Sequence, residues 1–361
     1  MKIISTGYTN TSAFDNPEIW LEHISFYTGI LEELSLDHEV ESIEQINFSG
    51  ETVRKNVRYH FLNYGPVTSH FSFKVNKYIK DLKPDVVLIN GFIFPIQVIQ
   101  LKLLVGKSCR LYIFHRAEKP FAGLKKYLQS FADQYIDGYF FSSLEFGTEW
   151  INKGIIKNEN KIYEVIQASS SFQPLDKKIV RSLLSIEGSP VFLWVGRLNT
   201  NKDPITVIKA FLQFLKVNPS AHLYMIYQDD EFLNEVKELI GNSDNIHLIG
   251  KVEHKNLEYW YSSADFIISG SHYEGSGIAI SEAMSCGCIP IVTNIISFRS
   301  MTGRGSCGLL YEPGNTNDLL KTLNRACKIN IIEERVRVIS QFKKELSFHS
   351  IKEKINAILT R

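Results

Sequence analysis

Residues 265–293 determine the predicted fold, and they read DFIISGSHYEGSGIAISEAMSCGCIPIVT. An apolar run, Phe266–Ile268, precedes a Gly-Ser-Gly turn, and a helical pattern then continues through Met284. Glycine is favoured just past the end of a helix, so Gly287 is expected to terminate this one before the apolar run Ile289–Val292. The stretch therefore predicts a strand, a tight turn, a helix and a second, parallel strand.

Similar short apolar runs recur along the chain and alternate with helical patterns. Strands that helices cover on both faces lose the alternation of apolar and polar residues, so this order predicts an α/β protein with doubly wound parallel sheets. The other expected strands are Val86–Ile89, Leu111–Phe114, Tyr139–Phe141, Val191–Val195 and Leu223–Tyr227. The expected helices include 17–36, 67–82, 205–215 and 231–240.

A segment rich in Ser, Pro and Gly, residues 168–189, separates two series of expected strands. We therefore predict a first domain over residues 1–172 and a second over 173–347. The amphipathic segment 348–361 is expected to pack back onto the first domain. Two open sheets joined in this way form a cleft at the carboxyl ends of their strands, where such folds bind ligands.

Composition excludes several classes of protein. The 361 residues carry 40 Lys and Arg against 39 Asp and Glu, so no global charge attracts nucleic acid. Five cysteines form no disulfide framework, and the N-terminal MKIISTGYTN lacks the apolar core of a signal peptide. The apolar segment 92–105 is interrupted by polar residues and is too short for a membrane span. These features predict a cytoplasmic protein.

Positive charge is concentrated locally, because residues 100–130 hold seven bases and one acid. A solvated helix face is one interpretation. The other is a surface for an anionic acceptor or for membrane headgroups, with peripheral binding to the inner face of a membrane.

The turn before the second-domain helix suits an anion. The backbone amides of Gly275, Ser276, Gly277 and Ile278 would be unpaired at the helix start, where the helix dipole favours phosphate.

Two carboxylates, Glu274 and Glu282, bracket this turn. If the helix starts at Gly277, Glu282 lies roughly 7 Å along its axis at about 1.5 Å per residue. Ionised carboxylates accept hydrogen bonds from sugar hydroxyls and repel phosphate. The pattern therefore predicts a ligand that is anionic in the middle and hydroxylated at both ends, which describes a nucleoside diphosphate sugar.

The stretch 191–204, VFLWVGRLNTNKDP, places two bases after another expected strand. Arg197 offers a planar fork to phosphate oxygens and Lys202 a compact charge, so the pair could neutralise a leaving diphosphate.

These segments, together with GLLYEPGN at 308–315, resemble the retaining glycosyltransferases of family four, which have the GT-B architecture of two Rossmann-like domains facing each other across a cleft. The resemblance implies that Glu274 contacts the transferred sugar, Glu282 holds the ribose, and Arg197 and Lys202 bind the diphosphate. It also places His115, which follows an apolar strand in YIFHRAEKP, near the reaction centre.

The reaction implied is hexosyl transfer from a UDP- or GDP-sugar to a hydroxyl of a glycan or lipid-linked acceptor, as in surface polysaccharide assembly. No cofactor and no metal are expected, because the bases and amides would stabilise the leaving group themselves.

Two features depart from the family pattern. Gly7 is followed by YTNTSAFDNP instead of a paired-glycine loop, and Asp229 and Asp230 replace a glycine-rich loop after the strand 223–227. The two acids could hold a metal or could offset the dipole of the next helix, and we favour the second interpretation.

Two alternative functions remain open from the sequence. A nucleotide-sugar 2-epimerase of the same architecture would release a modified sugar without an acceptor. A non-catalytic sensor would bind the nucleotide sugar without turning it over.

Overall fold

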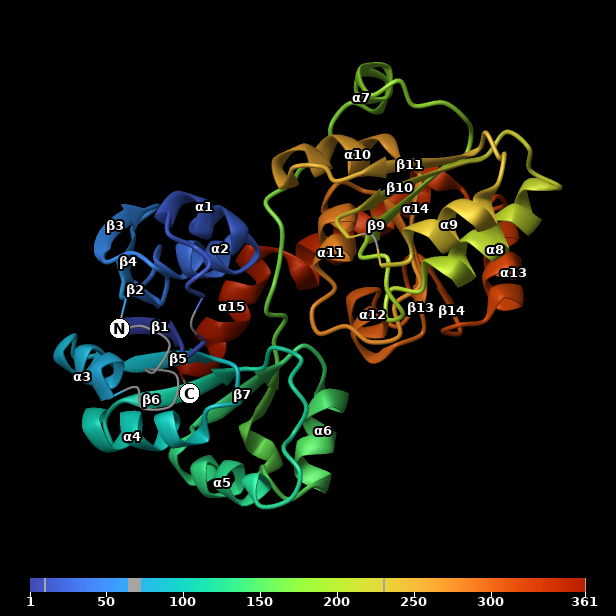
Figure 1. The fold of residues 1–361 in the computed structure, drawn as a ribbon. Coiled ribbons are helices and arrows are strands. Elements are labelled where there is room, and N and C mark those ends of the chain that lie inside the picture. Colours follow the sequence, from blue (N-terminus) through green and yellow to red (C-terminus); the bar gives the residue numbers. More distant parts are fainter. Residues whose placement is uncertain (10, 64–72, 230, 361) are drawn as a thin grey trace. The chain divides into compact units, whose positions relative to one another are not determined.

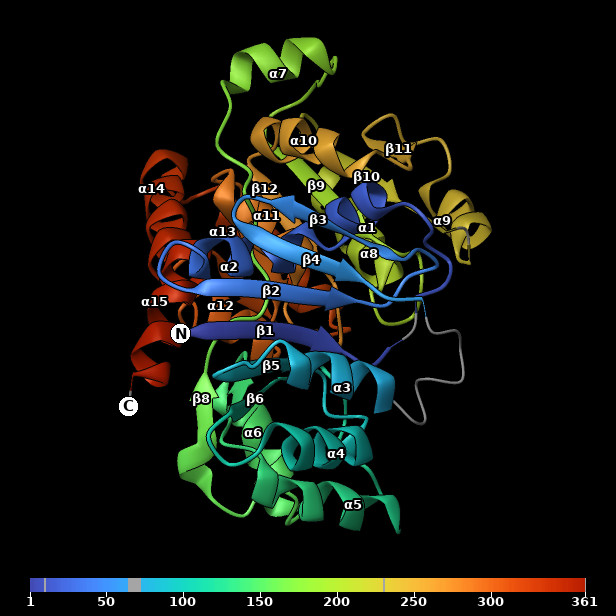
Figure 2. The same cartoon turned by 90° about the vertical axis from the view of Figure 1, so that its left-hand side faces the viewer.

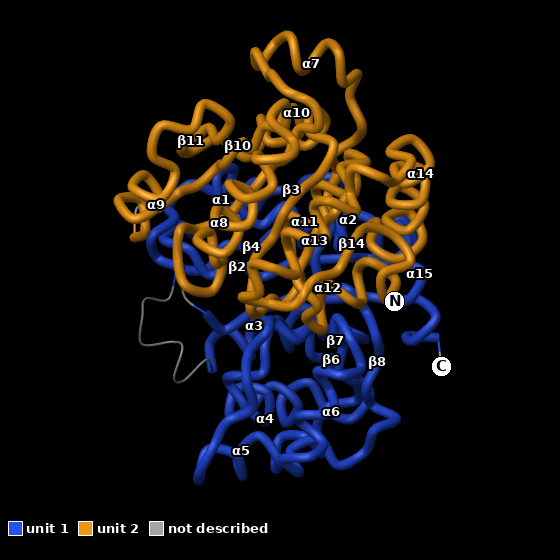
Figure 3. Tube along the Cα trace, turned by 90° about the vertical axis from the view of Figure 1, so that its right-hand side faces the viewer, with its two compact units in different colours: residues 1–169, 348–361 blue, residues 170–347 orange. Residues whose placement is uncertain are grey.

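The computed structural model describes residues 1–9, 11–63, 73–229 and 231–360, and the chain divides into two compact units (Figures 1 and 3). Unit 1 comprises residues 1–169 and 348–361, and unit 2 comprises 170–347. The predicted helix 67–82 lies partly outside the described residues, and Asp230 lies outside them.

Unit 1 contains an eight-stranded sheet in the order β3-β4-β2-β1-β5-β6-β7-β8. All neighbouring strands pair in parallel except β3 and β4. Figure 2 shows the arrows of β4, β2 and β1 side by side and pointing the same way. The strands are β1 (Lys2–Gly7), β2 (Glu39–Glu44), β3 (Gly50–Arg54), β4 (Val57–Phe61), β5 (Val86–Asn90), β6 (Arg110–Phe114), β7 (Gly138–Phe141) and β8 (Ile162–Glu164).

Helices connect these strands, as parallel pairing requires. They are α1 (Pro17–His23), α2 (Ser25–Leu34), α3 (Phe73–Asp81), α4 (Pro95–Val105), α5 (Lys125–Ala132) and α6 (Leu144–Asn152). The predicted single helix over 17–36 is wrong. Two helices meet at Ile24, whose backbone leaves the helical region at φ −99° and ψ 16°.

The terminal helix α15 (Phe348–Leu359) packs against α2 within unit 1. A methyl group added at Gly29 of α2 would overlap the ring of Phe348. Asn356 Oδ1 accepts from His38 Nε2 at 2.9 Å, and Asn356 Nδ2 donates to Asp37 Oδ2 at 2.9 Å. Close packing and hydrogen bonds therefore hold α15 against α2 and against the two residues Asp37 and His38.

Unit 2 contains a six-stranded parallel sheet in the order β11-β10-β9-β12-β13-β14. Its strands are β9 (Val191–Gly196), β10 (His222–Tyr227), β11 (Ile246–Gly250), β12 (Phe266–Ser269), β13 (Ile289–Thr293) and β14 (Leu309–Tyr311). Its helices are α7 (Lys177–Leu183), α8 (Pro204–Leu215), α9 (Leu233–Ile240), α10 (Leu257–Ser263), α11 (Ile278–Ser285), α12 (Ile296–Met301), α13 (Thr316–Ala326) and α14 (Ile331–Gln341). The two sheets with alternating helices confirm the predicted α/β fold class.

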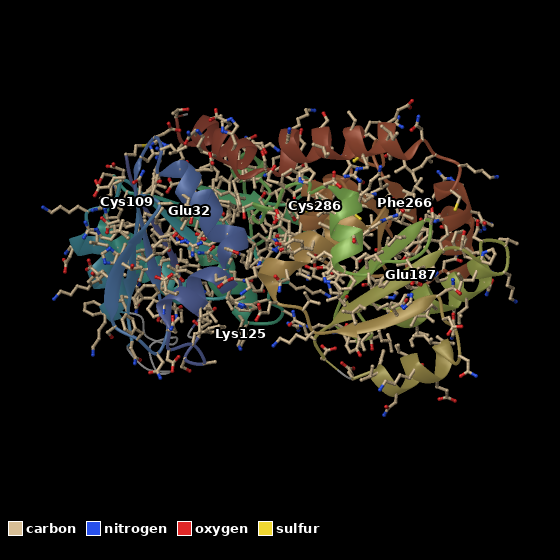
Figure 4. The ribbon with its side chains drawn as sticks, turned by 90° about the horizontal axis from the view of Figure 1, so that it is seen from above. Glu32, Cys109, Lys125, Glu187, Phe266 and Cys286 are labelled. Carbon is tan, nitrogen blue, oxygen red and sulfur yellow. The ribbon has the colours of Figure 1, made fainter. Side chains whose placement is uncertain are left out.

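The strands of unit 2 are continuous apolar runs because their side chains are buried in its core. Phe266 of β12 stacks on Phe192 of β9 with ring centroids 5.1 Å apart, and both side chains are fully buried. Cys286, just after α11, is also fully buried (Figure 4). Burial raises the pKa of its thiol to about 12, so the thiol stays protonated and unreactive at neutral pH.

Candidate functional site

The turn between β12 and α11 has the geometry that the sequence predicted. Gly277 is the N-cap of α11 and adopts φ 53° and ψ 51°, in the left-handed region that favours glycine. A methyl group there would lie 2.9 Å from Phe298 Cε1 and 3.0 Å from Met301 Sδ. Glycine at this position therefore allows the start of α11 to pack closely against α12.

The first turn of α11 leaves backbone donors unused. The amides of Ile280 and Ser281 both donate to Gly277 O, at 2.9 and 3.0 Å. Among the described residues, the amides of Ser276, Gly277 and Ile278 have no acceptor. Three unpaired donors at the positive end of a helix form an anion-binding arrangement.

The structure brings Lys202 and Glu274 together, although 71 positions separate them in the sequence. Lys202 Nζ forms an ion pair with Glu274 Oε1, and the two side chains are 26% and 15% exposed. Lys202 follows β9 and Glu274 follows β12, and these strands are neighbours in the sheet. The predicted diphosphate-binding base and the predicted sugar-binding carboxylate therefore share one side of unit 2.

Asn201 joins the two loops that carry this pair. Its side chain donates to Tyr273 O at 3.0 Å and accepts from Tyr273 N at 3.1 Å. Its backbone oxygen accepts from His272 N at 2.9 Å. Sequence reasoning missed this residue, because an asparagine in a loop is common and only the paired loop reveals its partners.

Gly270 allows the same two loops to approach each other. A methyl group at Gly270 would lie 2.8 Å from Asp203 O and 2.9 Å from Lys202 O. These are backbone atoms, so the added methyl could not be accommodated by a side-chain rotation.

We predict that Gly270→Ala lowers the free energy of unfolding by about 1–3 kcal/mol, the usual cost of forcing an extra group into a packed region. The substitution should also weaken the Lys202–Glu274 contact, because the backbone at Lys202 must move. Urea unfolding of the full chain measures the effect.

The matched control is Gly196→Ala at the end of neighbouring β9. A methyl there would contact only side-chain atoms, the nearest being Trp194 Cη2 at 3.1 Å. Equal destabilisation by both substitutions would contradict the backbone explanation.

Glu282 lies one turn into α11 and is 3% exposed. Its Oε1 is 2.6 Å from His254 Nε2, and its Oε2 accepts from Tyr261 Oη at 2.9 Å. Burial and the neighbouring carboxylate raise the pKa of Tyr261 well above its usual value, so this phenol remains a donor. A carboxylate has about four acceptor positions, which leaves capacity for a ligand hydroxyl. Sequence reasoning missed both partners of Glu282.

The structure also describes two other residues that the sequence singled out, Arg197 and Asp229. Arg197 is exposed just after β9. Asp229 Oδ1 accepts from Leu198 N at 2.7 Å, which gives this acid a structural partner. Among the described residues, no group of three His, Cys, Asp or Glu side chains could hold a metal ion.

His115 lies in unit 1 and is 3% exposed. Its Nε2 is 2.8 Å from Glu118 O, and its ring packs against Phe141, with ring centroids 4.6 Å apart, and against Trp150. Burial lowers the pKa of His115, so the ring is neutral at neutral pH. The contacts give it a structural role in unit 1, and its predicted catalytic role stays a prediction.

Residues 176–345 match the family of glycosyl transferases group 1, and this match contains Arg197, Lys202, Glu274 and Glu282. The matched residues all lie within unit 2.

Among curated proteins, the chain is 25% identical over 166 residues to the D-inositol 3-phosphate glycosyltransferase of Streptosporangium roseum. It is 27% identical over 181 residues to the mannosylfructose-phosphate synthase of Agrobacterium fabrum. These matches cover 43% and 47% of this chain, and the chain spans 38% of the length of each relative.

The solved structures resemble the whole chain. A glycosyltransferase from Rickettsia africae superposes with a TM-score of 0.75 at 18% identity, over 99% of this chain and 97% of that one. The Anabaena protein HepE, solved in complex with UDP-glucose, superposes with a TM-score of 0.71 at 14% identity, over 100% and 99%. The chain therefore has the GT-B fold that the sequence predicted.

Proposed function

We propose that the protein transfers a sugar from a nucleoside diphosphate sugar to a hydroxyl acceptor, with the anomeric configuration retained. The observation that carries this proposal is the pairing of Lys202 with Glu274 beside the unused amides at the start of α11. One arrangement thus holds a cation and amide donors for a diphosphate and a carboxylate acceptor for sugar hydroxyls.

Stabilisation of the leaving group is the main catalytic effect in this proposal. Cleavage of the glycosyl bond leaves negative charge on the diphosphate, which the amides of Ser276 to Ile278, Lys202 and Arg197 would receive. Because fixed donors need no reorganisation as the charge develops, their effect on the barrier is large.

The ion pair between Lys202 and Glu274 holds the predicted diphosphate-binding base beside the predicted sugar-binding carboxylate. An ammonium group has three donors and an ionised carboxylate about four acceptor positions. Lys202 could therefore donate to a diphosphate oxygen and Glu274 could accept from sugar hydroxyls while the two stay close together.

We expect Glu274→Gln to lower kcat by about 100-fold or more, the scale seen when a group that acts in the transition state is removed. The affinity for UDP alone should stay the same or rise, because Lys202 loses its competing partner. Lys202→Met should instead weaken UDP binding by about 10- to 100-fold, as expected when a charged hydrogen bond is lost.

Isothermal titration calorimetry with UDP and turnover assays with UDP-glucose measure the two effects. Full turnover by Glu274→Gln, or equal losses of UDP affinity in both variants, would refute these assignments.

The predicted ribose contact of Glu282 can be tested by comparing two ligands. Glu282→Gln should weaken UDP binding by about 10-fold or more, because an amide replaces one carboxylate oxygen that accepts from the ribose. Binding of inorganic pyrophosphate, which has no ribose, should not change. If both ligands lose affinity equally, Glu282 does not hold the ribose.

UDP-glucose is the first donor to test because HepE, which shares the fold, was solved with it. GDP-sugars are the second choice. An O-antigen chain mannosyltransferase and a poly(glycerol-phosphate) glucosyltransferase are among the relatives, which supports a glycan or lipid-linked acceptor in surface polysaccharide assembly. Product analysis separates transfer from the two alternatives: an epimerase releases a modified sugar without an acceptor, and a sensor binds the nucleotide sugar without turning it over.

The basic segment supports peripheral binding to an anionic membrane. Leu124, Tyr127, Leu128 and Phe131 form an apolar stripe along α5, and Leu124, the most exposed, is 85% exposed. Lys125 lies beside this stripe and is also exposed. Among the described helices, none combines the length and apolar character that a membrane span needs. An exposed apolar stripe with adjacent bases suits the headgroup region of a bilayer.

We predict that the full chain sediments with vesicles containing phosphatidylglycerol and less with pure phosphatidylcholine vesicles. Leu124→Glu with Tyr127→Glu should abolish the difference, because each substitution removes apolar area and adds a charge of the wrong sign. The control is Ile332→Glu with Val336→Glu on α14, where the exposed apolar pair lies among both acids and bases. Equal loss in both double variants would contradict a specific role for α5.

A further inference from the structure

The two donors that hold the Glu282 carboxylate come from elements other than α11. His254 begins the short 3₁₀ helix His254–Asn256, directly before α10, and Tyr261 lies on α10. Tyr261 is fully buried, whereas the His254 side chain is 43% exposed. The surroundings of Tyr261 therefore fix its position, and the orientation of His254 depends on whatever packs against its ring.

Phe172 packs against this ring. It lies in residues 170–175, the entry segment, with which unit 2 begins. Its ring centroid is 5.1 Å from that of His254, with the planes tilted by 33°, and 6.3 Å from that of Tyr261. A half-exposed imidazole rotates about its side-chain bonds, and an apolar ring packed on it removes much of that freedom. One aromatic side chain, itself 9% exposed, therefore lies beside both donors of the same carboxylate.

Backbone hydrogen bonds fasten the entry segment to α10. Gln173 N donates to Glu258 Oε1 at 2.6 Å, and Leu175 N donates to Ser262 Oγ at 3.2 Å. Both anchors follow Phe172 closely along the chain, so they hold its backbone near the helix that carries Tyr261. Contacts from the backbone and from the ring therefore set the position of Phe172.

The contacts of Glu282 leave part of each carboxylate oxygen available. Its Oε1 is engaged by His254 and its Oε2 by Tyr261. Because an ionised carboxylate only accepts, His254 Nε2 carries the proton in this contact. The two donors set the directions of the acceptor positions that remain. A ligand that meets preplaced acceptors does not lose affinity to the ordering of the side chain.

We propose that Phe172 and His254 are positioning residues for nucleotide binding: Phe172 orients His254, and His254 fixes the carboxylate of Glu282. The proposal rests on the proposed function in one respect, the ribose contact of Glu282. It adds that the entry segment contributes to nucleotide affinity through a side chain that needs no contact with the ligand. By linkage, a nucleotide that gains affinity from the docked entry segment also stabilises its docking.

The first test measures affinity for the full chain by isothermal titration calorimetry. UDP and GDP are both titrated, and the one that binds more tightly serves as the nucleotide probe. Inorganic pyrophosphate is the probe without a ribose. Phe172→Leu and His254→Leu should each weaken nucleotide binding by about three- to tenfold, the effect of one hydrogen bond. Pyrophosphate affinity should not change, which also shows that both variants are folded.

A double-mutant cycle tests whether Phe172 acts through His254. Residues that act in series are not additive, so Phe172→Leu should have little further effect on nucleotide affinity in the His254→Leu background. Additive losses would mean that Phe172 acts independently of His254, and they would overturn the proposal.

His254→Gln is the conservative variant. The amide of glutamine carries hydrogen-bond donors and can replace Nε2 in the contact with Glu282. This variant should bind the nucleotide more tightly than His254→Leu does. Equal losses in the two variants would overturn the donor role of His254.

Phe214→Leu is the matched control for Phe172→Leu. Phe214 lies on α8, is fully buried and packs on Phe192 of β9, with ring centroids 5.6 Å apart. The substitution removes the same atoms from the core of unit 2, between α8 and β9. It should lower the urea midpoint and leave nucleotide affinity unchanged. Equal losses of affinity in the two variants would mean that general loosening of unit 2 explains both, against the proposal.

Hydrogen exchange measures the reverse coupling. The nucleotide should slow exchange of the backbone amides of the entry segment, and it should do so much less in His254→Leu at equal saturation. Pyrophosphate should have no such effect, because it does not reach Glu282 with a ribose. A purely structural role of Phe172 would not link these amides to the nucleotide. Exchange that the nucleotide leaves unchanged would therefore overturn the proposal.

Turnover of UDP-glucose is measured separately. Because the two residues act on binding and not on the reacting bond, the Leu variants should raise KM and leave kcat nearly unchanged. If affinities follow the expected pattern but no sugar is transferred, the positioning role stands and the proposed transfer fails. If sugar is transferred but neither variant weakens nucleotide binding, the transfer stands and the positioning role fails. Binding of neither nucleotide by the unchanged chain would overturn both.

Discussion

The contact between the loops that follow β9 and β12 is the constraint on which the unit 2 site depends. These strands are neighbours in a parallel sheet, so their carboxyl ends meet at one edge. Gly270 permits the backbones to approach, and Asn201 ties one loop to the other through three hydrogen bonds. Lys202 and Glu274 can therefore form an ion pair although neither lies on a regular element.

The two units place different chemistry at the same kind of sheet edge. Unit 2 has a cation, unused helix amides and carboxylates, which together suit a phosphorylated and hydroxylated ligand. Unit 1 has a small cavity lined by apolar side chains together with Arg116, Glu44 and Glu118. This contrast follows from side chains in the loops, since the parallel sheets that support them are alike.

Local patterns allowed much of unit 2 to be predicted. The runs that became β9, β10, β12 and β13 are buried on both faces, so their apolar character is continuous and easy to detect. Strands such as β2, EVESIE, were missed because glutamates interrupt the pattern. In β2, Glu41 is buried because Lys2 and His60 bind it, and those partners come from other strands.

The sequence by itself determined the α/β class and the turn at Gly275 to Ile278, because each depends on residues close together along the chain. Only the tertiary structure decided which side chains meet. It paired Lys202 with Glu274, gave Glu282 the partners His254 and Tyr261, and buried His115 among aromatic rings. Such contacts join residues far apart in sequence, and their geometry depends on how the strands are ordered in each sheet.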